Sequence, residues 1–364
     1  MKARALLLLW TLLAATQLGA ASSEYLVGVY YFAGWWRDQP NKWVVDGKDW
    51  RKEWPSRVPL LGEYNDQPTM DREIAAAAQH GVDFFQILWY PAGKSPADWA
   101  ADPLNAGLRT FLASTNASRL RFTLEYVNHP PFDLQADEDW QSACDAWAKA
   151  MSHPRYLRVG GRPVFKIHGL HHFRNQNGGD PRRVTERLQI LREAARKSGL
   201  ADPLISAGVV PGDAGTLAKA ALPYDFVTTY MAMPNLAKVD QPYPYSRLLE
   251  HAEQAWPIYA EKCPRPYVPY VPSGWDPRPW KDPRPSFELP TRAEWKTALQ
   301  KAKAALDAYP NLGVRYGQNQ RQKMLLIYAW NEFGEGGMVA PTKGDGTLML
   351  EVIEQVFGEG KNHR

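Results

Sequence analysis

Short apolar runs rich in β-branched and aromatic residues alternate with segments whose apolar positions recur at helical spacing. Eight such pairs can be placed along the chain. The expected strands are Leu26–Phe32, Val82–Trp89, Arg121–Val127, Arg162–His168, Leu204–Val210, Asp225–Tyr230, Pro266–Val271 and Met324–Trp330. The helices expected after them are Thr69–His80, Leu104–Ser114, Glu138–Ser152, Pro181–Lys197, Ala214–Ala221, Ser246–Glu261, Thr291–Tyr309 and Thr347–Phe357. Eight βα units predict an α/β fold, a single (β/α)8 TIM barrel.

Residues at the ends of several segments support this assignment. Pro181 suits the first turn of a helix, and Gly199 suits a helix end. Thr291 with Glu294 has the pattern of a capping box. A doubly wound open sheet is the main alternative, but no glycine-rich dinucleotide turn follows the first strand, which disfavours it.

The longest connections all follow strands. In a barrel such βα loops lie on the C-terminal face, where active sites are found. The Pro-rich stretch from Trp275 to Pro290 fits a loop over the barrel mouth better than a linker, because barrel elements continue on both sides of it. The loops are Ala33–Pro68, His129–Asp137, His168–Asp180, Met231–Tyr245 and Pro272–Pro290.

The amino terminus has the pattern of a secretory signal peptide. A basic start precedes an apolar run, Ala5–Leu13, and small residues at Gly19–Ala21 suit cleavage after Ala21. The apolar run is short for a bilayer span, which needs about 20 apolar residues. We therefore expect a signal peptide over 1–21 and a barrel over 22–364 that is secreted or periplasmic, monomeric, and free of the membrane after cleavage.

Composition narrows the class of ligand. The formal net charge is only +4 and no basic run is present, so nucleic acid is not an expected partner. Cys144 and Cys263 are too few for a thiolate metal site, and they either pair or remain separate buried thiols. No cofactor is expected. The chain has 15 Trp and 17 Tyr, many in loops beside Pro and Gly, which suits stacking on the rings of a carbohydrate substrate.

The strongest chemical motif is Trp330-Asn331-Glu332-Phe333-Gly334-Glu335-Gly336, directly after an apolar strand. Glycosidic cleavage needs one carboxyl group to protonate the leaving oxygen and another as base or nucleophile. Each neighbouring carboxylate raises the other's pKa, which helps to keep one protonated. The motif therefore predicts Glu332 and Glu335 as catalytic residues, and a solvated acidic loop is the less favoured interpretation. The residues alone do not say which carboxyl group is the acid.

This motif resembles the W-N-E-W-x-E-G motif of glycoside hydrolase family 99 and the related WbsX-like proteins, with Phe333 in place of the usual Trp. The resemblance implies retaining endo-α-mannosidase chemistry, in which Glu332 removes the proton of the neighbouring 2-hydroxyl and a 1,2-anhydro sugar forms. Glu335 would be the general acid and then the base that activates water. Further pieces that match in order are Val29–Phe32, Gly81–Tyr90, Tyr156–Val164 and Ser273–Asp276 with Arg278.

Other candidate residues lie near the ends of strands. Glu125 suits substrate binding, or equally an ion pair that holds a barrel side chain. Trp275 and Asp276, near Arg278, suit either a clamp on sugar hydroxyls or a structural pair. His168 suits hydrogen bonding to sugar better than metal binding, and we expect no metal site; His171 and His172 are interpreted as plain loop residues. The remaining candidates for sugar contact are Trp89, Tyr90, Tyr31, Tyr230, Trp330 and Asn331, of which Trp89 and Tyr230 are favoured.

The expected function is that of a secreted glycoside hydrolase acting on a poly- or oligosaccharide. Three alternatives remain: a WbsX-like glycosyltransferase, a non-catalytic carbohydrate-binding barrel, and a metallohydrolase built on the strand-four histidines. An exported transferase would lack nucleotide-sugar donors, and no D-x-D metal motif lies in a βα loop. Both glutamates are present, which disfavours a non-catalytic barrel.

Overall fold

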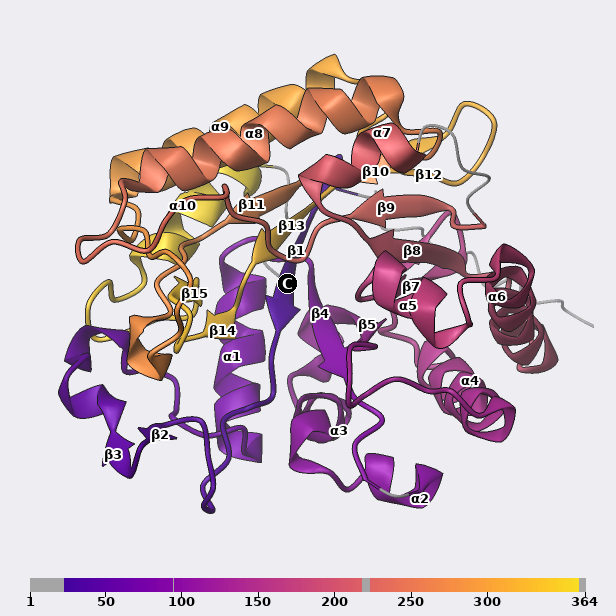
Figure 1. The fold of residues 1–364 in the computed structure, drawn as a ribbon, viewed down its shortest axis with the longest axis horizontal. Helices are drawn as coiled ribbons and strands as arrows, with labels where there is room; N and C mark the ends of the chain where they lie inside the picture. Colours follow the sequence, from indigo (N-terminus) through magenta and orange to yellow (C-terminus); the bar gives the residue numbers. More distant parts are fainter. Residues whose placement is uncertain (1–22, 94, 218–222, 360–364) are drawn as a thin grey trace, which may run out of the picture.

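The computed structural model describes residues 23–93, 95–217 and 223–359. Eight parallel strands form a nearly closed barrel with helices around it, which confirms the predicted fold class (Figure 1). The expected signal peptide lies outside the described residues and stays a prediction. The barrel strands are β1 (Tyr25–Tyr31), β4 (Phe84–Trp89), β5 (Arg121–Tyr126), β7 (Arg162–Ile167), β8 (Leu204–Gly208), β9 (Phe226–Thr228), β10 (Tyr267–Val268) with β11 (Tyr270–Pro272), and β13 (Arg321–Tyr328).

The seventh barrel strand is broken, where the sequence predicts one continuous run. Its first half, β10, pairs with β9, and its second half, β11, pairs with β13. Pro269 separates the halves and has no N–H to donate to a ladder, although its carbonyl accepts from Leu326 N at 2.9 Å. Because each half pairs with a different neighbour, this broken strand brings the two edges of the sheet together.

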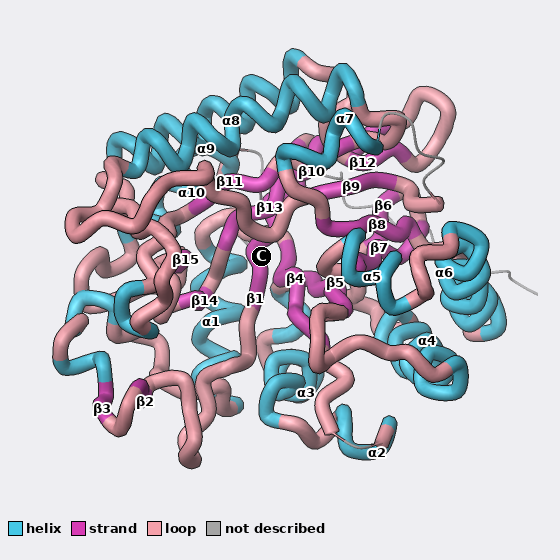
Figure 2. Tube along the Cα trace, in the orientation of Figure 1, coloured by secondary structure: helices cyan, strands magenta, loops and turns pink. Residues whose placement is uncertain are grey.

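Helices surround the strands, as the colouring by secondary structure shows (Figure 2). The eight helices expected from the sequence are all present within a few residues of their predicted bounds, although residues 218–222, at the end of the fifth, lie outside the described part of the chain. They are α1 (Gln67–Gln79), α3 (Ala106–Ala113), α4 (Asp137–Met151), α6 (Pro181–Lys197), α7 (Ala214–Leu217), α8 (Tyr245–Lys262), α9 (Arg292–Ala308) and α10 (Leu348–Phe357).

The predicted helix-end signals are confirmed. Thr291 and Glu294 form a reciprocal capping box at the start of α9. Asp180 caps α6 and Pro181 opens it. Gly199 follows that helix with a φ of 75°, a backbone conformation that glycine adopts without strain. Among the described residues, no helix is both long and apolar enough to cross a bilayer.

The long loops contain short elements that the sequence pattern did not predict. The most consequential is α5 (Leu170–Gln176), so His171 and His172 lie on a helix and not in a plain loop. Its buried apolar side chains, Leu170 and Phe173, are too few to give a visible period. The other additions are α2 (Pro96–Trp99), the short strands β2 (Val44–Val45), β3 (Lys48–Asp49), β6 (Arg158–Val159), β12 (Val314–Arg315), β14 (Asn331–Glu332) and β15 (Gly337–Met338), and the 3-10 turns 50–52, 55–57, 103–105, 117–119, 211–213 and 278–280.

The two cysteines are separate. Cys144 lies in α4 and Cys263 directly follows α8, and both are buried free thiols. Of the two possibilities open at the sequence level, the structure therefore shows the unpaired one.

Candidate active site

The two motif glutamates lie on a small hairpin that follows β13. In this hairpin β14 pairs antiparallel with β15, and Glu332 lies opposite Gly337. Glu335 occupies the turn, where its N–H donates to the carbonyl of Glu332 at 3.0 Å. Gly337 packs flat against the ring of Tyr328, because a Cβ there would lie 2.3 Å from a ring carbon. The glycines therefore let the hairpin fold tightly over the end of its own strand.

A tyrosine hydroxyl holds each carboxylate. Tyr230, which follows β9, donates to Oε1 of Glu332 at 2.6 Å. Tyr328, the last residue of β13, donates to Oε2 of Glu335. Arg284 of the Pro-rich loop lies 3.4 Å from the other oxygen of Glu335 and covers the ring of Trp275. The carboxylates thus have similar hydroxyl donors, but only Glu335 has an adjacent guanidinium among the described residues.

Burial gives both carboxyl groups an unusual affinity for protons. Burial, together with the negative charge of Glu335 and against the opposing hydrogen bond from Tyr230, raises the pKa of Glu332 to about 8. Burial also raises the pKa of Glu335, while Tyr328 and Arg284 oppose the rise. The free protein therefore holds a proton on this pair near neutral pH, and the surroundings favour Glu332 as its carrier.

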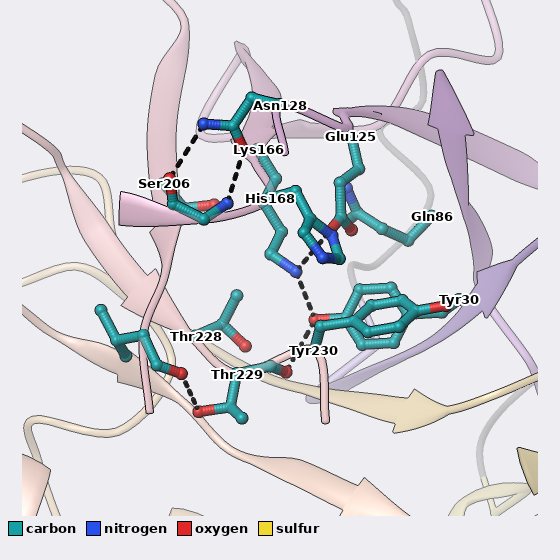
Figure 3. A network of polar contacts seen from close by, with 12 residues as sticks. Tyr30, Gln86, Glu125, Asn128, Lys166, His168, Ser206, Thr228, Thr229 and Tyr230 are labelled. Atoms are coloured by element: carbon teal, nitrogen blue, oxygen red, sulfur yellow. Dashed lines mark hydrogen bonds and ion pairs between the residues drawn. The ribbon is translucent and has the colours of Figure 1, made fainter. Parts of the chain in front are cut away.

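A buried ionic network lies next to Tyr230, the residue that holds Glu332 (Figure 3). Lys166 and Glu125 are opposite each other in the β5–β7 register, and Lys166 Nζ lies 2.7 Å from Oε1 of Glu125. The same amino group donates to the hydroxyl of Tyr30, and His168 Nδ1 lies 2.7 Å from the same Glu125 oxygen. Burial raises the pKa of Glu125, but Lys166 and His168 together outweigh it, so the pKa lies below its ordinary value.

The structure thus places Glu125 in the ion-paired role that the sequence left open. Its second oxygen, Oε2, is buried and makes no hydrogen bond to the described residues. The ring of Tyr30 packs against that of Tyr230, with centroids 4.7 Å apart and planes tilted by 59°, and Tyr230 carries the hydroxyl that holds Glu332.

Two cavities flank this arrangement on the C-terminal face of the barrel. One, of about 470 Å³, has Tyr90 and Lys42 in its wall together with aromatic side chains. Burial raises the pKa of Tyr90, and the three nearby carboxylates raise it further, which places its hydroxyl close to them. The second cavity, of about 280 Å³, has Tyr230 and four histidines in its wall. His129 lines both cavities, so they are adjacent.

Several expected contact residues point away from the mouth. Trp89, which the sequence favoured, packs outward between α2 and α4 against Trp99 and Trp147. Tyr31 and Trp330 also face the helix layer, where both donate to the carboxylate of Glu73 in α1. The physical reason is strand alternation, because successive residues face opposite sides and only one of two adjacent aromatics can face the mouth.

Asn331, Trp275 and Asp276 hold loops together. The amide of Asn331 bonds both backbone groups of Phe32, at 2.9 and 2.7 Å. Trp275 donates to the carbonyl of Pro285 at 3.1 Å, inside the Pro-rich loop. The carboxylate of Asp276 is buried between Arg57 and Arg278, so both of its oxygens are occupied. These contacts favour the structural pair over the sugar clamp among the two interpretations of Asp276.

The sequence reasoning missed Tyr328, Lys166, Lys42 and Arg284. Lys166 had a visible signal, since a lysine inside an apolar strand must be paired if it is buried. Lys42 and Arg284 lie on loops, and their positive charges lower the pKa of Glu335. Nothing in the sequence pattern distinguishes them from other basic loop residues.

The described residues contain no group of three or more His, Cys, Asp or Glu side chains arranged to hold a metal ion. The single D-x-D triplet of the chain, Asp137-Glu138-Asp139, opens α4 in the helix layer. There Asp137 pairs with Arg183 and Arg187. The triplet is therefore engaged at the periphery of the barrel, away from the glutamate hairpin.

Comparison with known families and structures agrees with this architecture. Residues 133–353 match the family model described as glycosyltransferase WbsX. The fold is similar to that of the GH99 endo-alpha-mannosidase from Bacteroides thetaiotaomicron, with 14% identity, a TM-score of 0.56 and coverage of 91% of this chain and 95% of that one. It is also similar to an exo-beta-1,4-mannosidase from Opitutaceae bacterium strain TAV5, with 15% identity, a TM-score of 0.52 and coverage of 93% and 60%. No curated protein sequence matches the chain.

Proposed function

The chain belongs to the WbsX family, and from this premise we propose that it is a glycoside hydrolase that cleaves glycosidic bonds in an oligo- or polysaccharide. One observation carries the proposal: two neighbouring carboxyl groups lie at the mouth of the barrel, each bonded to a tyrosine hydroxyl and each with a raised pKa. Such a pair supplies a proton donor and a base or nucleophile within one site.

The surrounding groups suit a sugar substrate. The larger cavity presents flat aromatic rings, from Trp36, Tyr90 and Phe132, beside the donor groups of Asn41 and Lys42. Aromatic faces stack on the apolar faces of sugar rings, and a few polar groups fix the orientation of a bound ligand. The second cavity has the hydroxyl-bearing Tyr230 in its wall, and the two cavities share His129. Export of the protein, as the amino-terminal pattern predicts, would bring it to extracellular glycans.

The roles of the two glutamates are a separate part of the proposal. The family resemblance assigns Glu332 as the base toward the 2-hydroxyl and Glu335 as the acid. In the free protein the surroundings favour a proton on Glu332, because Arg284 and Tyr328 stabilise charge on Glu335. We propose that a substrate hydroxyl donating to Glu332 stabilises its ionised form and moves the proton to Glu335, as the resemblance requires.

The name of the family model favours one alternative, a transferase that uses an activated sugar. A retaining hydrolase and a transferase can share a carboxylate pair, and they differ in whether water or a sugar hydroxyl accepts the glycosyl group. We favour the hydrolase because the predicted export would separate the protein from nucleotide-sugar donors. Incubation with nucleotide sugars and an acceptor glycan distinguishes the two activities directly.

The testing experiment is hydrolysis of a panel of α-mannans and other microbial, algal and plant polysaccharides by the wild type, Glu332→Gln and Glu335→Gln. Removal of a general acid or base costs on the order of 100- to 10,000-fold in rate. Glu351→Gln is the control, because Glu351 is an exposed glutamate on α10. Activated aryl glycosides then separate the roles, since a good leaving group restores activity to the acid variant and not to the base variant.

Cleavage that is lost in both variants, and retained in the control, supports the proposal. Cleavage that survives both substitutions contradicts it and moves the search to Glu125. Sugar transfer from a nucleotide donor without hydrolysis would establish the transferase alternative.

A further inference from the structure

We propose that the smaller cavity beside Tyr230 binds a negatively charged substituent of the glycan, a carboxylate or a sulfate, so that the substrate is an acidic glycan. We call this cavity the histidine pocket; it is lined by His129, His168, His171, His172, Asp213 and Tyr230, with the backbone of 169–170, 208–210 and 231. The inference rests on the proposed hydrolase function and names its substrate class.

Four imidazoles converge on the pocket from two neighbouring βα loops. His129 follows β5, His168 follows β7, and His171 and His172 lie on α5. The ring of His129 is 5.9 Å from that of His168 and 6.3 Å from that of His172, centroid to centroid. An oxyanion that accepts at about 2.8 Å from two ring nitrogens fits between rings at this separation.

Hydrogen bonds outside the pocket fix which ring nitrogens remain available. His168 Nδ1 bonds the carboxylate of Glu125, and His129 Nδ1 bonds the carbonyl of Pro130 at 3.0 Å. Because a carbonyl or carboxylate can only accept, both Nδ1 atoms carry a proton. The Nε2 atoms of these two rings are therefore left to take a ligand, and each becomes a donor when its imidazole is protonated.

The one carboxylate in the wall of the pocket does not compete for these donors. Asp213 accepts from His171 at 2.7 Å with one oxygen and from the N–H of Val210 at 2.9 Å with the other. Glu332 accepts from the hydroxyl of Tyr230, which lines the pocket, and is not itself among the lining residues. While the imidazoles are neutral, the free Nε2 atoms are acceptors, which suit a sugar hydroxyl; once the rings are protonated, the same atoms become donors that suit an anion.

The charges around the rings make anion binding dependent on pH. Burial holds the pKa of His168 and His172 below the ordinary value. For His168, Glu125 opposes this effect and Lys166 and His129 reinforce it. For His172 the positive charges of the neighbouring histidines reinforce it and Asp133 opposes it. His168 and His172 are therefore neutral near pH 7 in the free protein, and a bound anion would draw a proton onto them.

The experiment is isothermal titration calorimetry of the Glu335→Gln protein, which binds without turnover. The probes are trisaccharides of galacturonate, of mannuronate and of 6-sulfated galactose, each beside its carboxyl-reduced or desulfated counterpart. Titrations at pH 6 and 7.5 in two buffers of different ionisation heat count the protons taken up with each charged probe relative to its neutral counterpart, so that any proton released from Glu332 cancels. His172→Gln removes one imidazole, and His251→Gln, on α8 and outside the pocket, is the matched control.

We expect at least one charged probe to bind about tenfold or more tightly than its neutral counterpart, the effect of one charge-assisted hydrogen bond. Binding should take up protons and tighten as the pH falls, and His172→Gln should remove most of both effects while His251→Gln keeps them. Comparison of the uronate probes with the sulfated probe then shows whether the pocket prefers a carboxylate or a sulfate. Equal affinity for charged and neutral probes, or binding without proton uptake, overturns the inference.

The outcome is separable from that of the proposed function. If charged probes bind with proton uptake but the wild type cleaves no glycan, the pocket assignment stands and the hydrolase proposal fails. If the wild type cleaves neutral glycans as well as their charged forms, the hydrolase proposal stands and the pocket assignment fails.

Discussion

Replacing Glu332 by glutamine should stabilise the protein in alkaline solution, because the native state holds this carboxyl group in surroundings that disfavour its charge. The pKa of Glu332 is about 8 in the folded protein against an ordinary value of 4.5. Between these values the folded state binds more protons than the unfolded state, so the free energy of unfolding falls as the pH rises. Glutamine is neutral throughout and still offers Tyr230 an oxygen.

The size of the effect follows from the same values. Each pH unit of difference corresponds to about 1.4 kcal/mol, so the window from pH 4.5 to about 8 amounts to at most about 5 kcal/mol. Part of the shift comes from the charge of Glu335, and the pair relieves that repulsion when Glu335 carries the proton instead. We therefore expect Glu332→Gln to gain about 2 to 5 kcal/mol over the wild type at pH 9, and little at pH 5.

Urea unfolding of both proteins at pH 5, 7 and 9 measures the difference. Glu73 is a second buried acid, with a pKa of about 7, and its contribution cancels because it is present in both. Glu351→Gln is the control: Thr347 and Arg292 lower the pKa of this exposed group, so its effect should not change between pH 5 and 9. A stability difference for Glu332→Gln that is the same at all three pH values would refute the reasoning.

Three further outcomes follow from the packing. Arg57→Met should lower the free energy of unfolding by about 2 to 3 kcal/mol in urea, because it removes the more deeply buried of the two cations of Asp276 and leaves only Arg278; a loss below about 1 kcal/mol would contradict this. Gly337→Ala should reduce kcat/KM by about 100-fold, because the new methyl group must displace Tyr328, whereas Gly212→Ala, which meets open space, should keep the activity in the same assay. Both cysteines should react with a thiol reagent only after denaturation, because burial raises their pKa, and a reductant should leave the melting temperature unchanged.

The barrel was predictable because its strands are buried on both faces and therefore form short continuous apolar runs. Helix ends such as Thr291 with Glu294 added signals that depend only on local hydrogen bonds. The break at Pro269 was not visible, because the flanking apolar residues continue across it. Helix α5 was missed for a different reason, since seven residues hold too few apolar positions to show a period.

The candidate site was predictable only in part. Glu332 and Glu335 stand out because carboxylates among glycines and aromatics directly after an apolar strand are unusual. Which of two adjacent aromatic residues faces the mouth depends on the direction in which each side chain of the strand points. Trp89 packs outward on Trp147, so its neighbour Tyr90 faces the mouth. Tyr328 looked like one more core residue, and only the hairpin folding back over its ring brings Glu335 to its hydroxyl.

The two glutamates finally differ less in their own bonds than in what surrounds them. Each accepts from a tyrosine, so the guanidinium of Arg284 beside Glu335 is the main asymmetry, and it favours charge on Glu335 in the free protein. A glycan hydroxyl that donates to Glu332 would reverse this preference by stabilising its ionised form. The substrate would then determine which carboxyl group is the acid. The pH profile of kcat/KM reports the ionisation of the free enzyme, and that of kcat reports the ionisation of the complex, so their apparent pKa values should differ. Identical profiles would mean that the protein alone, without the substrate, determines which carboxyl group is the acid.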